Sequence, residues 1–465
     1  MVEKTHKLMF IRLTLSRLKR LAQVVFLLSA FLTSASARAE SIRLVTDEET
    51  ELFLAEILQP IYKAAGIRFY RNSVFIVEDN SLNAFVGDGN NMFVHTGTIM
   101  NADNYNQLSG VLAHETGHIQ GGHILRQKMK LQGLQQASLA SLVAAGVLGA
   151  VTGRADVGMA ILMGTSSSAI YNMTAYQVQE ERSADEAAVQ LLAKTRQSPA
   201  GMRDFMKKIQ QQNVMSGIDE NSYFRTHPVT AERVAFLSNA AEKSPFKVDM
   251  LKQKRFEMIQ AKLRGFLEAP EKVLRRYPLK DVSAPARYAR SIAYFKQLKT
   301  AAALKELDSL IAEAPKNPFF YELKGQIYTE NGQIAEARAA YQKAYDLLPY
   351  SALFQLNLAQ IMLEASPSSA DVQKIINLLN KSLIQRPDTY AWLFLSRAYG
   401  LKNDEAYANY AAAEFSLRIG ELDVAERQAG EARKYKMPRQ LELKLQDLEN
   451  RLKELQKIRR QQMQQ

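Results

Sequence analysis

The sequence predicts a mostly helical α+β domain with one small sheet, followed by an all-α array of helical repeats. Three observations support this prediction. Residues 73–97 alternate runs rich in valine and phenylalanine with asparagine-glycine turns, which predicts two or three short strands. From about Tyr105 onward the apolar residues recur with helical spacing. Beyond residue 250 a pattern of about 34 residues recurs, which is typical of a helical repeat array.

Composition indicates a globular chain with more than one domain. The chain has 465 residues, of which 47% are hydrophobic and 23% are charged. It contains no cysteine, which excludes both disulfide bonds and lipid attachment through a cysteine. Residues 1–39 hold seven basic side chains and one acidic side chain, so removing them lowers the formal net charge from +12 to +6. A charge this small on so long a chain does not favour nucleic acid as a partner.

The first 39 residues have the composition of a secretory signal peptide. Basic residues precede a short apolar run, and small residues follow it. We expect cleavage after Ala37 or Ala39, with Ala39 preferred, and export to a bacterial periplasm. The alternative is an uncleaved anchor, which is disfavoured because the apolar run is short for a bilayer span.

Residues 40–250 are predicted to form the first domain. A helix is expected over residues 48–66, ending at Gly66, and it is followed by the strands of residues 73–97. Residues 138–170 are rich in alanine and glycine, and neither half is long enough to span a membrane. A packed helical hairpin is the simpler interpretation of this segment. The alternative is a flap that covers an active site or contacts a membrane surface.

Residues 251–438 are predicted to form a tetratricopeptide-repeat solenoid, with an unrelated helical bundle as the alternative. One copy precedes the clearest repeat, a third covers Ser351 to Pro387, and two weaker copies follow within residues 391–433. In the clearest repeat, small residues should let the paired helices approach, aromatic residues fill the gap and proline ends the second helix. These positions are Tyr321, Gly325, Tyr328, Ala337, Tyr341, Ala344 and Pro349.

Residues 439–465 are predicted to form one amphipathic helix that caps the solenoid or pairs with another helix. Its leucines follow one another at alternating steps of four and three, which places them on one face. They are Leu441, Leu445, Leu448, Leu452 and Leu455.

The chemistry concentrates in "VLAHETGHIQGGH", residues 111–123. His114 and His118 lie one helical turn apart, so both imidazoles can bind a single tetrahedral Zn²⁺ ion. Glu115 is placed to act as a general base on water, which is the H-E-x-x-H arrangement of zinc peptidases. His123 falls one residue before the position of a third metzincin histidine, which here is Ile124. As a ligand it would require the helix to break at Gly121-Gly122.

A better third ligand lies in "QEERSADEAAVQLL", residues 179–192. Glu181 and Asp185 are four residues apart and therefore share one helix face. Glu181 can complete a His₂Glu site, while Asp185 can accept a hydrogen bond from the outer nitrogen of a ligating imidazole. The alternative is a solvated acidic first turn of the helix.

Three ordered motifs resemble the HtpX and CaaX-prenyl-protease-like gluzincin peptidases over roughly residues 42–240. They are "HETGH", then "EERSADE" as E-x-x-A-D, then "THPVTAER" as H-P-x-x-x-x-R. "NAFVGDGNNMFVHTG" is similar to the strand pair that precedes the family's zinc helix, and His123 matches a histidine common there. The resemblance implies a zincin-type metallopeptidase domain with one Zn²⁺ per chain.

The resemblance also assigns roles to further residues. His227 would face Glu115 across the zinc, where it could donate to the oxyanion or occupy the fourth zinc position and keep the enzyme latent. An ordinary surface histidine is the remaining interpretation of His227. Arg233 would brace an acidic side chain, and His123 would be a bystander or a supporting residue. The edge strand that would pair with an extended substrate backbone carries Asn83, Ala84 and Phe85.

Three functions remain open at this point. The first is a periplasmic zinc endopeptidase that removes unfolded or misassembled envelope proteins, with the repeats docking substrates or partners. The second is a chaperone or assembly factor whose peptidase site is mostly latent. The third is a metal-free scaffold, which the three ordered motifs disfavour. Family likeness alone implies the outer-membrane barrel-assembly machinery as a partner.

Overall fold

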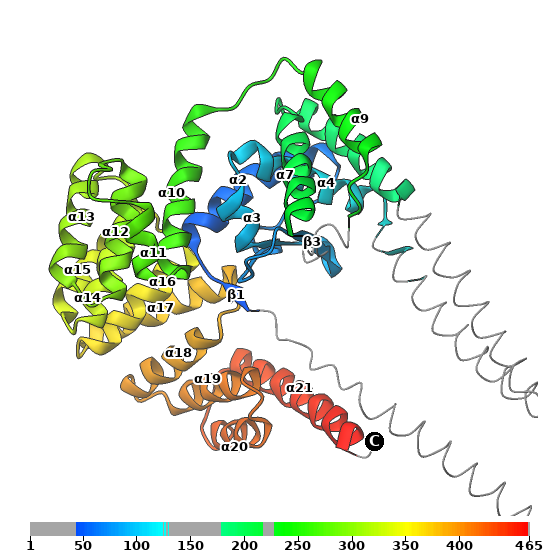
Figure 1. The fold of residues 1–465 in the computed structure, drawn as a ribbon. Helices are drawn as coiled ribbons and strands as arrows, with labels where there is room; N and C mark the ends of the chain where they lie inside the picture. The colour runs from blue at the N-terminus through cyan, green and yellow to red at the C-terminus, as the bar shows by residue number, and fades with distance from the viewer. Residues whose placement is uncertain (1–42, 124, 127–128, 130–177, 217–226, 464–465) are drawn as a thin grey trace, which may run out of the picture. The chain divides into compact units, whose positions relative to one another are not determined.

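The computed structural model describes residues 43–123, 125–126, 129, 178–216 and 227–463 (Figure 1). A small sheet lies near the start of this part, and helical repeats form its C-terminal half, which confirms the predicted fold class. The predicted signal peptide and the alanine-rich segment 138–170 lie outside the described residues. Among the helices that are described, none is long and apolar enough to cross a membrane.

The sheet has four strands in the order β1-β2-β4-β3. β1 and β3 form its two edges; β1 pairs antiparallel with β2, β2 parallel with β4, and β3 antiparallel with β4. The sequence pattern predicted two or three strands in residues 73–97, where β2, β3 and β4 lie, but not the two-residue β1. Bounds are Leu44–Val45 for β1, Val74–Val77 for β2, Ala84–Gly87 for β3 and Asn91–His95 for β4.

Helices pack beside this sheet in one apolar core. The N-cap side chains of Asp47 and Asn104 accept hydrogen bonds from the backbone amides of Thr50 and Gln107, which satisfies amides that a helix start leaves unpaired. The helices are α2 (Glu48–Ala64), α3 (Thr96–Asn101), α4 (Tyr105–Gln120), a helix over residues 178–194, α7 (Ala200–Ser216), α9 (Ala231–Glu242) and α10 (Met250–Leu267).

α10 belongs to two cores at once. Its Phe256 and Leu263 lie in the core around the sheet, whereas its Phe266 packs against the core of the first repeat helices. The Gln260 side-chain amide donates to the Ile99 and Ala102 carbonyl oxygens at 3.0 and 2.7 Å. α10 therefore fixes the turn that leads from α3 into α4.

The repeat helices stack in antiparallel pairs, as expected for a tetratricopeptide array. A Cβ atom on Gly325 would lie 2.7 Å from the Tyr341 ring, so this glycine permits the predicted close contact of α14 with α15. The two weak copies share α19 and therefore give three helices rather than four. Bounds are α11 Pro270–Arg276, α12 Ala284–Lys296, α13 Thr300–Glu313, α14 Pro318–Glu330, α15 Ile334–Leu347, α16 Ala352–Glu364, α17 Ser369–Gln385, α18 Thr389–Leu401, α19 Glu405–Arg418 and α20 Leu422–Ala432.

The C-terminal helix α21 (Arg439–Met463) packs on the last repeat helices. Four of its five predicted leucines are buried in a core shared with α19 and α20, whereas Leu455 is exposed. The buried carboxylate of Glu414 on α19 accepts a hydrogen bond from Arg451 on α21 at 2.6 Å. The helix thus covers the apolar end of the array.

A buried ionic cluster joins α2 and α10 to the repeat helices. The Lys262 ammonium on α10 contacts the carboxylates of Asp47, the N-cap of α2, and of Glu49 on α2, and it lies 3.7 Å from Glu322 on α14. The Tyr288 hydroxyl on α12 donates to Glu49 at 3.1 Å. Three largely buried carboxylates thus share one ammonium. Burial raises the pKa of Glu49 to about 7.

We predict that this cluster makes stability depend on pH. Because folded Glu49 keeps its proton up to a pKa of about 7, against 4.5 for an ordinary glutamate, the folded state binds more protons between these values. Stability should therefore fall as the pH rises through this window. Glu49→Gln should weaken that fall, as measured by urea midpoints at about pH 5 and about pH 8. The exposed Glu454→Gln is the control, and an equal pH response in wild type and Glu49→Gln would contradict the prediction.

One glycine sets the distance between α4 and the helix over residues 178–194. A Cβ atom on Gly117 would lie 2.7 Å from the carbonyl oxygen of Ala184, which is closer than a side chain tolerates. Ala184 is itself completely buried. Small residues on both helices therefore let the two backbones touch.

We predict that Gly117→Ala destabilises the fold, although alanine is the better helix former. The added methyl group must push two backbones apart, and such overpacking costs about 1–3 kcal/mol. Gly430→Ala in α20 is the matched control, because nothing lies within 4 Å of that Cβ position. It should leave stability unchanged or raise it by up to about 1 kcal/mol. Similar thermal unfolding midpoints for both variants would refute the tight contact.

Candidate metal centre

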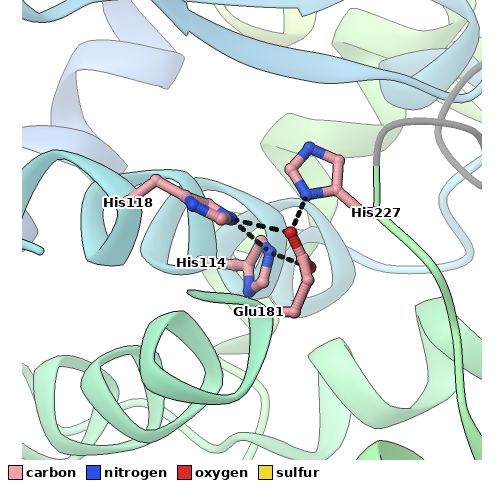
Figure 2. A group of neighbouring side chains, drawn as sticks. All are labelled: His114, His118, Glu181 and His227. Atoms are coloured by element: carbon pink, nitrogen blue, oxygen red, sulfur yellow. Dashed lines mark hydrogen bonds and ion pairs between the residues drawn. The ribbon is translucent and has the colours of Figure 1, made fainter. Parts of the chain in front are cut away.

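Three segments bring four buried side chains together (Figure 2). α4 supplies His114 and His118 from one face, the helix over residues 178–194 supplies Glu181, and His227 lies just before α9. All four are at least nine-tenths buried. Their ligand atoms all lie within 4.8 Å of one another. The motifs that are scattered along the sequence therefore converge at one point.

The distances within this group are those of atoms facing a common centre. The Nε2 atoms of His114 and His118 are 3.1 Å apart. The two Glu181 oxygens lie 3.2 Å from His114 Nε2 and 3.3 Å from His118 Nε2. The Nδ1 atom of His227 lies 2.9 Å from Glu181 Oε1. Figure 2 shows these contacts as dashed lines.

This arrangement fits a divalent metal ion. Ligands about 2.0–2.1 Å from one tetrahedral Zn²⁺ lie about 3.3 Å from one another, close to the separations found here. Imidazole nitrogens and a carboxylate are also the donor types that such a site uses. Glu115 Oε1 is buried beside the group without a hydrogen-bond partner, so a polar ligand or cation would satisfy it.

Each ligand histidine is held by its outer nitrogen. His114 Nδ1 lies 2.9 Å from the carboxylate of Asp185, as predicted for this pair. His118 Nδ1 lies 2.8 Å from His123 Nδ1, so one nitrogen donates and the other accepts. Contacts of this kind fix the orientation and the tautomer of an imidazole ring, and they leave Nε2 able to face a metal ion.

His123 reaches His118 because the helix ends early. α4 stops at Gln120, and Gly122 adopts a left-handed backbone conformation with φ of +64°. The helix therefore does break at Gly121-Gly122, which was the condition stated for His123 as a ligand and was not itself predicted. It places His123 against a ligand ring rather than in the group of ligand atoms.

Arg233 braces both carboxylates from the other side. Its guanidinium donates to the two Asp185 oxygens at 2.7 and 2.9 Å and lies 2.9 Å from Glu181 Oε2. It also donates to the Pro228 carbonyl oxygen at 2.6 Å, which ties the backbone next to His227 to the same side chain. A buried carboxylate pair requires such a counter-charge.

The buried charges perturb the pKa values of the group. Burial disfavours the charged form of His114, but hydrogen bonds to Asp185 and Glu181 outweigh it and raise its pKa to about 9. Burial lowers the pKa of His118 to about 3. Burial also opposes ionisation of Glu181, yet hydrogen bonds from the three histidines hold its pKa far below the usual value. The centre thus holds an ionised carboxylate beside a neutral imidazole.

Glu115 has the environment of a base rather than of a ligand. It follows His114 on α4, is 2% exposed and lies outside the group of ligand atoms. Burial raises the pKa of its carboxyl group. His227 Nε2 lies 3.5 Å from Glu115 Oε1, so His227 faces Glu115 and Glu181 together.

The predicted substrate strand is the edge strand β3. Its outer side has no pairing strand among the described residues. Ala84 and Phe85 lie in β3, and Asn83 precedes it. The Asn83 backbone amide donates to the Thr98 hydroxyl, and this hydroxyl donates to the Asn83 carbonyl oxygen, each at 2.7 Å. His95 ends β4, and its Nδ1 atom lies 2.9 Å from the Ser81 hydroxyl oxygen.

Residue-by-residue reasoning missed two small residues, Gly117 and Ala184. Neither carries chemistry, yet their contact brings Glu181 to the histidines. A signal was present, since both lie inside the motifs "HETGH" and "EERSADE". Small residues on facing helices are the expected mark of close backbone approach.

Comparison with known proteins agrees with this geometry. Residues 48–241 match Peptidase family M48, and residues 281–366 match a tetratricopeptide repeat-like domain. The "Beta-barrel assembly-enhancing protease" of Escherichia coli (strain K12) is 27% identical over 76% of this chain and 72% of its own length. The Yersinia pestis protein of the same name is 26% identical over 74% and 72%. "Metalloprotease LoiP" of Escherichia coli is 25% identical over 34% of this chain and 58% of its own length.

Both domains occur in this order in the chain, and the metal-binding geometry lies within the first of them. The chain is therefore a metallopeptidase that carries a peptidase family M48 domain followed by a tetratricopeptide-like domain.

Proposed function

We propose that this metallopeptidase is a zinc-dependent endopeptidase of the bacterial periplasm that acts on unfolded or misassembled envelope and outer-membrane proteins. The carrying observation is the convergence of His114, His118 and Glu181 beside the buried Glu115. The names of the relatives support an outer-membrane context, because they refer to β-barrel assembly.

His114, His118 and Glu181 would hold the zinc ion. The ion would polarise the scissile carbonyl group and lower the pKa of a water molecule. Glu115 would take a proton from the attacking water and pass it to the leaving amine, and the pKa of its carboxyl group, which burial raises, suits both halves of this transfer. Asp185, Arg233 and His123 hold the ligands in place through the contacts described above.

The outer edge of β3, which pairs with no strand among the described residues, is the proposed binding place for the substrate backbone. An extended peptide that pairs with a strand edge is recognised mainly through its main-chain hydrogen bonds. Recognition of this kind has weak sequence preference and requires an unfolded segment. It therefore favours misfolded polypeptide over a folded protein.

Periplasmic location rests on the N-terminal composition, and partner docking rests on the repeats. We propose that the repeat domain binds substrates or the outer-membrane barrel-assembly machinery, as the names of the relatives suggest. The proposal includes no nucleic-acid partner.

We predict that Glu115→Gln abolishes cleavage of an unfolded model protein while zinc stays bound. Loss of the general base should lower the rate at least about 100-fold. Glu232→Gln, on the same domain with a 73% exposed side chain, is the matched control and should cleave normally. Zinc content is measured on all three chains. Undiminished cleavage by Glu115→Gln would sink the proposed mechanism.

A second function, that of an assembly factor with a latent peptidase site, is favoured by the position of His227. Its Nδ1 atom lies 2.9 Å from Glu181, and it belongs to the group that could hold one ion. A fourth protein ligand would close a zinc site, whereas catalysis requires an open position. His227 in this place would have to move before a substrate carbonyl could approach.

We predict that His227→Ala raises the cleavage rate and weakens zinc binding, because a fourth ligand is removed. Cleavage of an unfolded model protein and zinc competition with a chromogenic chelator measure the two effects. If cleavage falls and zinc affinity is unchanged, His227 instead donates to the oxyanion, and the hypothesis that His227 keeps the peptidase latent is wrong.

A further inference from the structure

A cavity of about 610 Å³ lies where the start of the peptidase domain meets the end of α17, and it shares no lining residue with the metal centre. We call it the α17 groove. The sheet side contributes Leu44, Tyr70, Arg71 and Phe75, and the repeat side contributes Ile384 and Arg386. Two domains therefore line one groove at the sheet edge opposite β3.

The floor of the α17 groove is a partly bare strand. β1 pairs only with Ile76 and Val77, so Val74 and Phe75 have no strand on that side among the described residues. Both residues line the groove. A strand edge left open in this way offers main-chain groups to an extended peptide.

The groove carries exposed apolar side chains beside its charged and polar ones. Leu44, Tyr70 and Ile384 are large apolar side chains that remain exposed, and Ile384 is exposed to 86%. Large apolar side chains gathered around one cavity mark a binding surface more often than isolated ones do. Ile384 lies near the end of α17. Its side chain is not packed within the described part of the fold, so packing does not explain an apolar residue at this position.

The charges of the groove are already neutralised within the chain. Arg386 donates to both oxygens of Glu51 at 3.1 and 2.9 Å. Arg71 forms an ion pair with Glu48. Two cations and two anions therefore cancel, which leaves no spare charge to recognise an acidic or a basic partner. The complementary partner is an uncharged segment.

We propose that the α17 groove is a second substrate site that binds an extended, uncharged segment of the polypeptide being cleaved. The segment pairs with the bare half of β2 and places apolar side chains against Tyr70 and Ile384. This inference rests on the proposed action on unfolded polypeptide. It gives the repeat domain a direct part in holding the substrate, at the opposite sheet edge from the cleavage site.

The test uses the full mature chain carrying Glu115→Gln, so that binding is measured without cleavage. The probe is a short fluorescein-labelled peptide of alternating valine and threonine, followed by fluorescence anisotropy. Ile384→Gln removes one apolar contact and should weaken binding about tenfold. Leu279→Gln is the matched control, since Leu279 is a 71% exposed aliphatic residue that does not line the groove.

Equal affinities for Ile384→Gln and Leu279→Gln would overturn the proposal, as would no binding by the parent chain. A second readout uses chains with Glu115 intact. Ile384→Gln should raise KM for an unfolded protein and leave cleavage of a short peptide unchanged. The two proposals can fail separately. If no chain shows any cleavage, and the peptide nevertheless binds in a way that depends on Ile384, the proposed function is wrong but the α17 groove is still a peptide-binding site.

Discussion

The metal centre depends on one backbone contact, that of Gly117 with Ala184. Because no side chain separates the two helices, the Glu181 carboxylate comes within 3.3 Å of two imidazole nitrogens that lie more than sixty residues earlier in the chain. Histidines four residues apart come from helix geometry alone. A carboxylate from another helix requires tertiary packing, and the two small residues supply it. The small residues Gly117 and Ala184, which lie in the same motifs as the candidate ligands, are therefore as necessary to the site as those ligands.

Close packing of this kind concentrates charge, and the remaining contacts compensate for it. Glu181 and Asp185 would repel each other in a buried site if Arg233 did not lie against both. The same arginine binds the Pro228 carbonyl oxygen, so the counter-charge also fixes the segment that carries His227. Ligand geometry and access to the site are thus connected through one side chain. Any movement of His227 away from Glu181 must take place beside this anchor.

Local patterns predicted much of the fold and most of the site, and the exceptions share a cause. Helix spacing and ordered motifs identified His114, His118 and Glu181, because each signal lies within a few residues. The two-residue β1 has no periodicity to detect, and its pairing with β2 is a tertiary event. Likeness left His123 as either a bystander or a supporting residue, because its contact with His118 depends on the left-handed turn at Gly122. The two weak repeats share α19, and the sequence of either copy alone could not predict this.

The junction of the two domains has the character of a core rather than of a linker. α10 fixes the turn before the metal helix through Gln260, and from the same helix Lys262 holds Asp47 and Glu49 of α2. Tyr288 and Glu322 of the repeat helices complete that cluster. Removing one partner would leave buried charge uncompensated, so the two domains resist separation. The repeat helices and the helices around the candidate metal centre are therefore joined by buried contacts rather than by a flexible tether.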